Sequence, residues 1–263
     1  MPDVTKLNKS VCYRLQKLRS ERQSVAYPRH RAGAVSFSGL NYRKIPFRQS
    51  ATVRNALNIE SGFVREIEQI LDFWFGACGP NGALDPAKKK MWFGDGRKYD
   101  AVIRKRFGKL HSRASRGELD VQWAAMPRGR IALIVVLDQM SRHIHRGTPA
   151  AFAQDPAAQR LAVTGVEKSV DQELVPAQRV FFFLPFEHAE DLELQRLGVR
   201  CFDGLARTVS EPCRKEYESF ADYARRHCEI VERFGRFPHR NQPLGRVSTP
   251  EEIKFLKQPG SSF

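Results

Sequence analysis

A short acidic stretch with one histidine follows an aromatic run in the second half of the chain. The aromatic run is residues 181–183, and the polar members after it are Glu187, His188, Glu190 and Asp191. If this stretch is one helix, the spacing of four between Glu187 and Asp191 places both carboxylates on the side that carries His188. Carboxylates beside an imidazole can shift one another's pKa or bind a cation. This stretch is therefore our first candidate site.

The chemistry that suits this stretch is proton transfer. A carboxylate that orients an imidazole raises its basicity and fixes its tautomer, which a general base requires. We therefore take His188, Glu190 and Asp191 as candidate catalytic residues, with His188 oriented by one of the two acids. A metal is not expected, because the sequence has no HExxH or paired ExxH pattern. The alternative is a buried salt-bridge network that pairs these acids with arginines.

Two further polar groups could hold a ligand. Near the C-terminus, Arg236, His239, Arg240 and Asn241 form a loop around Pro238. Guanidinium groups bind phosphate or carboxylate through paired hydrogen bonds. On an apolar segment, Asp138, Arg142 and Arg146 lie on one polar strip. With Glu187, these residues make up the predicted ligand-binding set, although all of them could instead serve as structural ion pairs.

The segments that must position these groups have helical periodicity. We expect helices that begin near residue 62, at 86, near 99, at 127, at 155, at 176, near 216 and at 250. The helix from 127 should reach 146, and the helix from 176 should reach about 205. Asp85, Thr249 and Gly235 have the residue types of helix caps. Because no segment alternates convincingly with a period of two, the sequence predicts an all-α body, a compact helical bundle.

Charge is distributed unevenly along the 263 residues. The net charge is +15, and residues 1–60 contain 12 Lys or Arg against 3 Asp or Glu, leaving 32 against 26 for the rest. We predict that residues 1–60 are a disordered basic extension or a targeting segment, and that residues 61–258 are the folded domain. This distribution argues against nucleic-acid binding, except through residues 1–60. The chain has no apolar run of about 20 residues, so we predict no membrane span.

The five cysteines are scattered and form no CxxC pair. A reducing compartment fits this pattern, and we predict the cytoplasm, or an organelle if residues 1–60 are a transit peptide. The sequence does not identify a cofactor.

Several stretches resemble the DUF924 family, a bacterial-type family of unknown function. They are residues 71–76, 91–95, 107–123, 127–155, 181–195 and 223–256. The resemblance implies an all-helical, tetratricopeptide-like superhelical arrangement. Three sequence patterns of the family match this chain. They fall on Asp138, Gln139, Arg142 and Arg146, on Glu187, His188, Glu190 and Asp191, and, at every position, on residues 235–241. His143 stands where the family has Asn, and Ala189 where it has Ser.

The resemblance brings no activity with it, so two functions remain open. The chain could be a hydrolase or transferase that acts on a small anionic substrate in a polar Arg/His/carboxylate pocket. It could instead be a non-catalytic, tetratricopeptide-like module that binds a peptide or a small anionic ligand. A deep pocket with a strongly shifted acid favours the enzyme, and an open concave groove favours the binding module.

Overall fold

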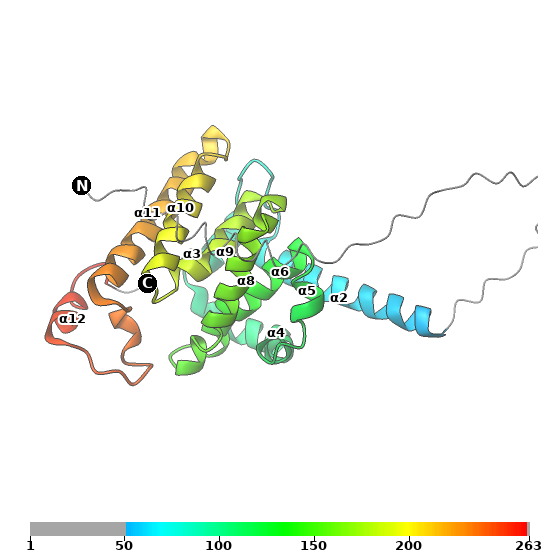
Figure 1. Cartoon of the computed structure of the whole chain (residues 1–263), viewed down its shortest axis with the longest axis horizontal. Coiled ribbons are helices and arrows are strands. Elements are labelled where there is room, and N and C mark those ends of the chain that lie inside the picture. The colour runs from blue at the N-terminus through cyan, green and yellow to red at the C-terminus, as the bar shows by residue number, and fades with distance from the viewer. Residues whose placement is uncertain (1–50, 262–263) are drawn as a thin grey trace, which may run out of the picture. The chain divides into compact units, whose positions relative to one another are not determined.

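The computed structural model describes residues 51–261, and the elements of this part of the chain are all helical (Figure 1). The α-helices are α2 (Ala51–Phe75), α3 (Pro86–Phe93), α4 (Asp100–Ser115), α5 (Asp120–Trp123), α6 (Pro127–Ile134), α7 (Ser141–Ile144), α8 (Asp155–Glu167), α9 (Pro176–Glu187), α10 (Leu192–Ala206), α11 (Glu211–Phe234) and α12 (Pro250–Phe255). Short 3-10 turns are η1 (Gly96–Tyr99), η3 (Pro149–Ala151), η4 (Val170–Glu173) and η5 (Pro238–Arg240), and η2 (Val135–Met140) is a π-helical turn. The predicted all-α class is confirmed for these residues, whereas the tetratricopeptide-like superhelix stays a prediction.

The core is built around α6 and α9. Residues 131–136 are completely buried, as are the phenylalanines of α9 at 181–183 and 186. The ring of Phe181 meets Trp74 of α2 edge to face at 5.7 Å and Trp92 of α3 at 4.7 Å. Aromatic pairs of this kind add about 0.5–1.5 kcal/mol each to the stabilisation from burial. Helices far apart in the sequence are therefore held in fixed positions around α9.

Helix α2 begins at Ala51, before the start that we predicted near Gly62. A Cβ at Gly62 would meet no atom within 4 Å, and one glycine in a helix costs only about 1 kcal/mol, which is too little to end it. Residues 51–60, which we assigned to the extension, are thus helical. Our prediction of disorder for residues 1–50 lies outside the described residues.

The stretch that we expected to be one helix from 176 to about 205 is two helices. Helix α9 ends at Glu187, and α10 begins at Leu192 with Asp191 as its N-cap, whose Oδ1 accepts a hydrogen bond from the Leu194 amide at 2.9 Å. Gln195 donates to the backbone oxygens of Glu187 and Ala189 at 2.6 and 2.7 Å, which satisfies carbonyls left at the break. The prediction that Glu187 and Asp191 share one helical face was wrong.

The helix from residue 127 stays helical as far as Ile144, but it contains the wide turn η2. Such π turns are rare, and they occur frequently at functional sites. Asp138, one of our candidate residues, lies within it.

The predicted caps have the expected geometry. Asp85 accepts from the Ala87 amide at 2.9 Å, and Gly235 has a left-handed φ of 67° at the end of α11. Thr249 and Glu252 form a reciprocal capping box at the start of α12. Helix α11 begins at Glu211, earlier than the predicted start near 216, with Pro212 in its first turn.

Candidate functional site

Asp138 is at the centre of a buried polar group. Its side chain is fully buried on η2, and its two carboxylate oxygens lie 2.8 and 3.0 Å from Nδ1 of His188. Nη1 of Arg142 is 3.2 Å from Oδ1, and Gln139 donates to Oδ2 at 2.6 Å. Burial alone would raise the pKa of Asp138, but the charge of Arg142 and the contact with His188 hold it below its usual range. Asp138 is therefore an ionised carboxylate.

The tautomer of His188 follows from this contact. Burial lowers the pKa of His188, the charge of Arg142 lowers it further, and Asp138 offsets only part of the shift, so the imidazole is neutral at pH 7. An ionised carboxylate can only accept hydrogen bonds, so Nδ1 must carry the proton and donate it to Asp138. Nε2 then holds the lone pair, and no described side chain is hydrogen-bonded to it. The side chain of His188 is 16% exposed.

Asp155 joins two arginines to this pair. Arg142 binds it in a forked arrangement, with Nη1 and Nη2 at 2.9 and 3.1 Å from the two carboxylate oxygens. Nη1 of Arg240 lies 3.3 Å from Oδ2 of the same carboxylate. The guanidinium of Arg240 also lies 4.8 Å from the ring of Phe152 and 4.5 Å from that of Phe237. Burial lowers the pKa of Arg240 to about 10, so it is still a cation.

We call this set the Asp138 cluster. Its members are Asp138, Arg142, Asp155, His188 and Arg240. It contains two carboxylates and two guanidiniums, and its imidazole is neutral, so its formal charge is balanced. His239 is close enough to interact electrostatically with His188 and both arginines, and burial lowers the pKa of its imidazole to about 4.

Glu187 lies beside the cluster and is in the opposite protonation state from Asp138. Its side chain is buried, and burial, together with the charge of Asp138, raises its pKa to about 8. Nδ1 of His227 is 3.3 Å from Oε1 of Glu187 and 2.8 Å from the carbonyl oxygen of Tyr223. Burial lowers the pKa of His227 to about 3, so the two groups face each other as neutral partners.

The two acids that we expected to orient His188 have other partners. Glu190 accepts from Arg246 at 2.6 and 2.9 Å and from the Phe237 amide at 2.8 Å. Asp191 caps α10 and is exposed. The carboxylate that contacts His188 is instead Asp138, so this part of the prediction was wrong. The helix break after Glu187 is the physical reason, because it turns residues 190 and 191 away from the face of α9.

Three of the predicted ligand-binding residues hold other parts of the chain together. Arg236 forms a forked ion pair with Glu252 at 2.7 and 2.8 Å, and Asn241 donates to the same carboxylate at 3.2 Å. Arg146 forms a forked pair with Asp100 at 2.6 and 2.7 Å. These contacts agree with the structural alternative that the sequence left open for them.

Sequence reasoning missed Asp155, Arg246 and Phe152. The Asp155–Pro156 pair is typical of a helix start, and Asp155 is indeed the first residue of α8. Its side chain nevertheless binds Arg142 and Arg240, and no local pattern indicates this.

Another buried histidine, outside the Asp138 cluster, contacts a serine but does not activate it. Nε2 of His111 lies 2.8 Å from Oγ of Ser141. That hydroxyl donates its proton to the carbonyl oxygen of Leu137 at 2.6 Å, so it accepts from His111. Burial lowers the pKa of His111 to about 4. The pair is therefore a structural hydrogen bond rather than a nucleophile with its base.

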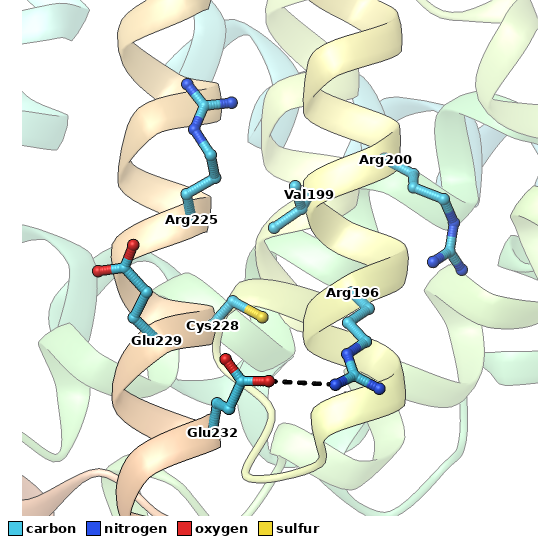
Figure 2. Close-up of a pocket in the computed structure, with 7 residues that line it drawn as sticks. All are labelled: Arg196, Val199, Arg200, Arg225, Cys228, Glu229 and Glu232. Atoms are coloured by element: carbon cyan, nitrogen blue, oxygen red, sulfur yellow. Dashed lines mark hydrogen bonds and ion pairs between the residues drawn. The ribbon is translucent and has the colours of Figure 1, made fainter. Parts of the chain in front are cut away.

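A groove away from this cluster lies between α10 and α11 (Figure 2). Its volume is about 330 Å³, and Arg196, Val199, Arg200, Arg225, Cys228, Glu229 and Glu232 line it. Arg196 and Glu232 pair across it at 3.1 Å. None of the predicted site residues lines this groove.

The described part of the chain gives two further results. Between residues 51 and 261, no group of three or more His, Cys, Asp or Glu side chains is arranged to hold a metal ion. Within the same range, no helix has both the length and the apolar character needed to cross a membrane.

Comparison with known proteins identifies the family. The family model described as "Bacterial protein of unknown function (DUF924)" matches residues 70–260. A solved structure, that of the protein of unknown function ATU0120 from Agrobacterium tumefaciens, is 35% identical with a TM-score of 0.61, and the match covers 74% of this chain and 98% of that one. A comparison with curated proteins gives no significant match. The chain therefore belongs to the DUF924 family of bacterial proteins of unknown function.

Proposed function

We propose that the protein is an enzyme, a hydrolase or transferase, in which His188 acts as a general base on a small anionic substrate. The observation that carries this proposal is the Asp138–His188 pair. Asp138 accepts a hydrogen bond from Nδ1 at 2.8 Å, which leaves Nε2 as the basic atom of a side chain that is 16% exposed. A buried carboxylate in this position raises the basicity of the imidazole and stabilises the imidazolium that forms when it takes a proton.

The two arginines support an anionic substrate. Arg142 and Arg240 are both held by Asp155, and the side chain of Arg142 keeps 20% of its exposure. Fixed guanidinium groups at a water-poor site stabilise negative charge that develops during a reaction. The cluster contains no hydroxyl or thiol group. His188 would therefore take a proton from water or from the substrate itself.

The location of Asp138 on a π turn adds to this proposal. A π turn widens the helix locally, and such turns are frequent at functional sites. The cytoplasm stays our proposed location, on the cysteine pattern described above.

Turnover by a His188 variant tests the proposal. Full-length protein would be assayed against panels of small esters, amides and phosphate esters, together with His188→Gln and the control His145→Gln. We expect the first variant to lose activity by roughly 10²–10⁴-fold while keeping the wild-type helical content and melting temperature. The control should keep full activity. Full turnover by His188→Gln would remove the general base from the proposal.

A non-catalytic binding module is the second candidate, and the groove between α10 and α11 favours it (Figure 2). Arginine and glutamate side chains both line the groove, so it could bind a peptide that has both positive and negative groups. The groove is separate from the Asp138 cluster. Binding that survives His188→Gln but is lost in Arg200→Glu would favour this function over catalysis.

A further inference from the structure

Arg240 has more hydrogen-bonding capacity than the protein uses. Its residue is 6% exposed, so the guanidinium is almost wholly removed from bulk water. The hydrogen bond that it makes goes from Nη1 to Asp155 at the long distance of 3.3 Å. Nε is buried without a partner among the described residues. A buried, charged donor left unpaired costs about 1–3 kcal/mol or more, so a hydrogen-bond acceptor at this position would be strongly favoured.

Asp155 cannot satisfy Arg240 by itself. Its two oxygens are already bound by the forked contact with Arg142 at 2.9 and 3.1 Å, and Arg240 shares the second of these oxygens. The other neighbours of Arg240 are the rings of Phe152 and Phe237, which attract the cation but accept no conventional hydrogen bond. Arg240 is therefore held in place by aromatic contacts while some of its donors are left for another group.

The location of Arg240 connects it with His188. Arg142 interacts with the ring of Phe152 at 5.7 Å and contacts Asp138, which binds His188. An anion held by Arg240 would thus lie within the same polar group as the proposed general base.

The charge balance of the cluster limits the anion to a single negative charge. The carboxylates of Asp138 and Asp155 already offset the two guanidiniums, and Glu190 is offset by Arg246. Each additional negative charge placed in this poorly hydrated site has a large desolvation cost. A carboxylate adds one charge and matches the fork of a guanidinium, whereas a phosphate monoester adds up to two.

We propose that Arg240 binds the carboxylate group of a small monocarboxylic substrate, whose apolar part contacts the partly exposed ring of Phe152. This inference rests on the proposed function, because it names the group by which the substrate of that site is held. It assigns recognition to Arg240 and proton transfer to His188.

Binding of simple carboxylates tests this inference without any turnover. Benzoate, propionate and inorganic phosphate would be titrated into full-length protein at constant ionic strength, by calorimetry and by NMR of the arginine Nε–H signals. The proteins are wild type, Arg240→Gln, Arg240→Lys, His188→Gln and the control Arg207→Gln, which changes an exposed arginine at the C-terminal end of α10. We expect saturable carboxylate binding by wild type and by the control, weakened roughly 10- to 100-fold in Arg240→Gln. The carboxylate affinity of Arg240→Lys should lie between those of wild type and Arg240→Gln. If Arg240→Gln does not fold, Arg240→Lys provides the test.

Three outcomes would overturn the inference. They are an affinity unchanged in both Arg240 variants, no saturable binding of either carboxylate to wild type, and tighter binding of phosphate than of both carboxylates. Carboxylate binding that persists in His188→Gln supports the inference even if His188 proves not to be a general base, so the two proposals can fail separately.

Discussion

The Nδ1 atom of His188 lies 2.8 Å from Oδ1 of Asp138, although the two residues are 50 positions apart. One belongs to the break between α9 and α10, and the other to the π turn after α6. Because Asp138 is fully buried and ionised, this contact fixes the ring orientation and the protonated nitrogen of His188.

The first prediction is the tautomer of His188. We expect ¹⁵N NMR to show a neutral ring protonated at Nδ1 at pH 7, with a pKa lower than that of an exposed histidine, because burial and Arg142 disfavour the cation. In Asp138→Asn, the amide can donate to Nδ1, so the population should move toward the Nε2–H tautomer. A wild-type ring protonated at Nε2 would contradict the assignment.

The second prediction is the cost of removing the carboxylate that binds both arginines. Asp155→Asn removes the carboxylate that pairs with both Arg142 and Arg240, so we expect the free energy of unfolding to fall by about 3–5 kcal/mol. Urea denaturation measures this change. The matched control is Asp203→Asn, which removes an exposed pair with Arg225 and should cost less than about 1 kcal/mol. Equal losses of unfolding free energy in the two variants would show that the buried ion pairs of Asp155 stabilise the protein no more than an exposed pair does.

The third prediction concerns the pH dependence of stability that Glu187 causes. Folding raises the pKa of Glu187 from 4.5 to about 8, so the folded state binds one proton more than the unfolded state between these values. The stability that this proton gives is complete below pH 4.5 and is lost as the pH rises through 8. Between pH 6.5 and 8.5, wild type should lose about 2 kcal/mol more than Glu187→Gln, whose amide does not titrate.

Urea denaturation at these two pH values gives the comparison for Glu187. The buried histidines titrate near pH 6.5 in the unfolded state, but this contribution is common to wild type and Glu187→Gln and cancels in the comparison. Parallel pH profiles for wild type and Glu187→Gln would mean that Glu187 is already ionised in the folded protein.

The fourth prediction separates Asp191 from the site. Asp191→Ala removes the N-cap of α10, so we expect a loss of about 0.5–2 kcal/mol in unfolding free energy. The ¹⁵N shifts of His188 should stay as in wild type, because Asp138 rather than Asp191 contacts that ring. A change in the His188 tautomer in Asp191→Ala would show that Asp191 does act on that ring.

Part of the site could be predicted from the sequence. His188, Arg142, Arg240 and Asp138 were each singled out by residue type and spacing, and the structure brings all four together. The sequence left two roles open for Arg236, ligand binding and a structural ion pair, because a guanidinium binds a carboxylate of the protein as well as one of a ligand. In the structure, Arg236 binds the carboxylate of Glu252.

The sequence by itself determined the features that depend on neighbours a few positions away. The all-α class, the cap at Asp85, the capping box of Thr249 and Glu252, and the glycine at 235 are local, because a helix end is satisfied by side chains within one turn. The tertiary structure decided which carboxylate faces His188 and what Asp155 binds. These pairings join residues from different elements, and their energies depend on burial and on the charges that the packing of η2, α7, α8 and the end of α9 brings within 3 Å of one another.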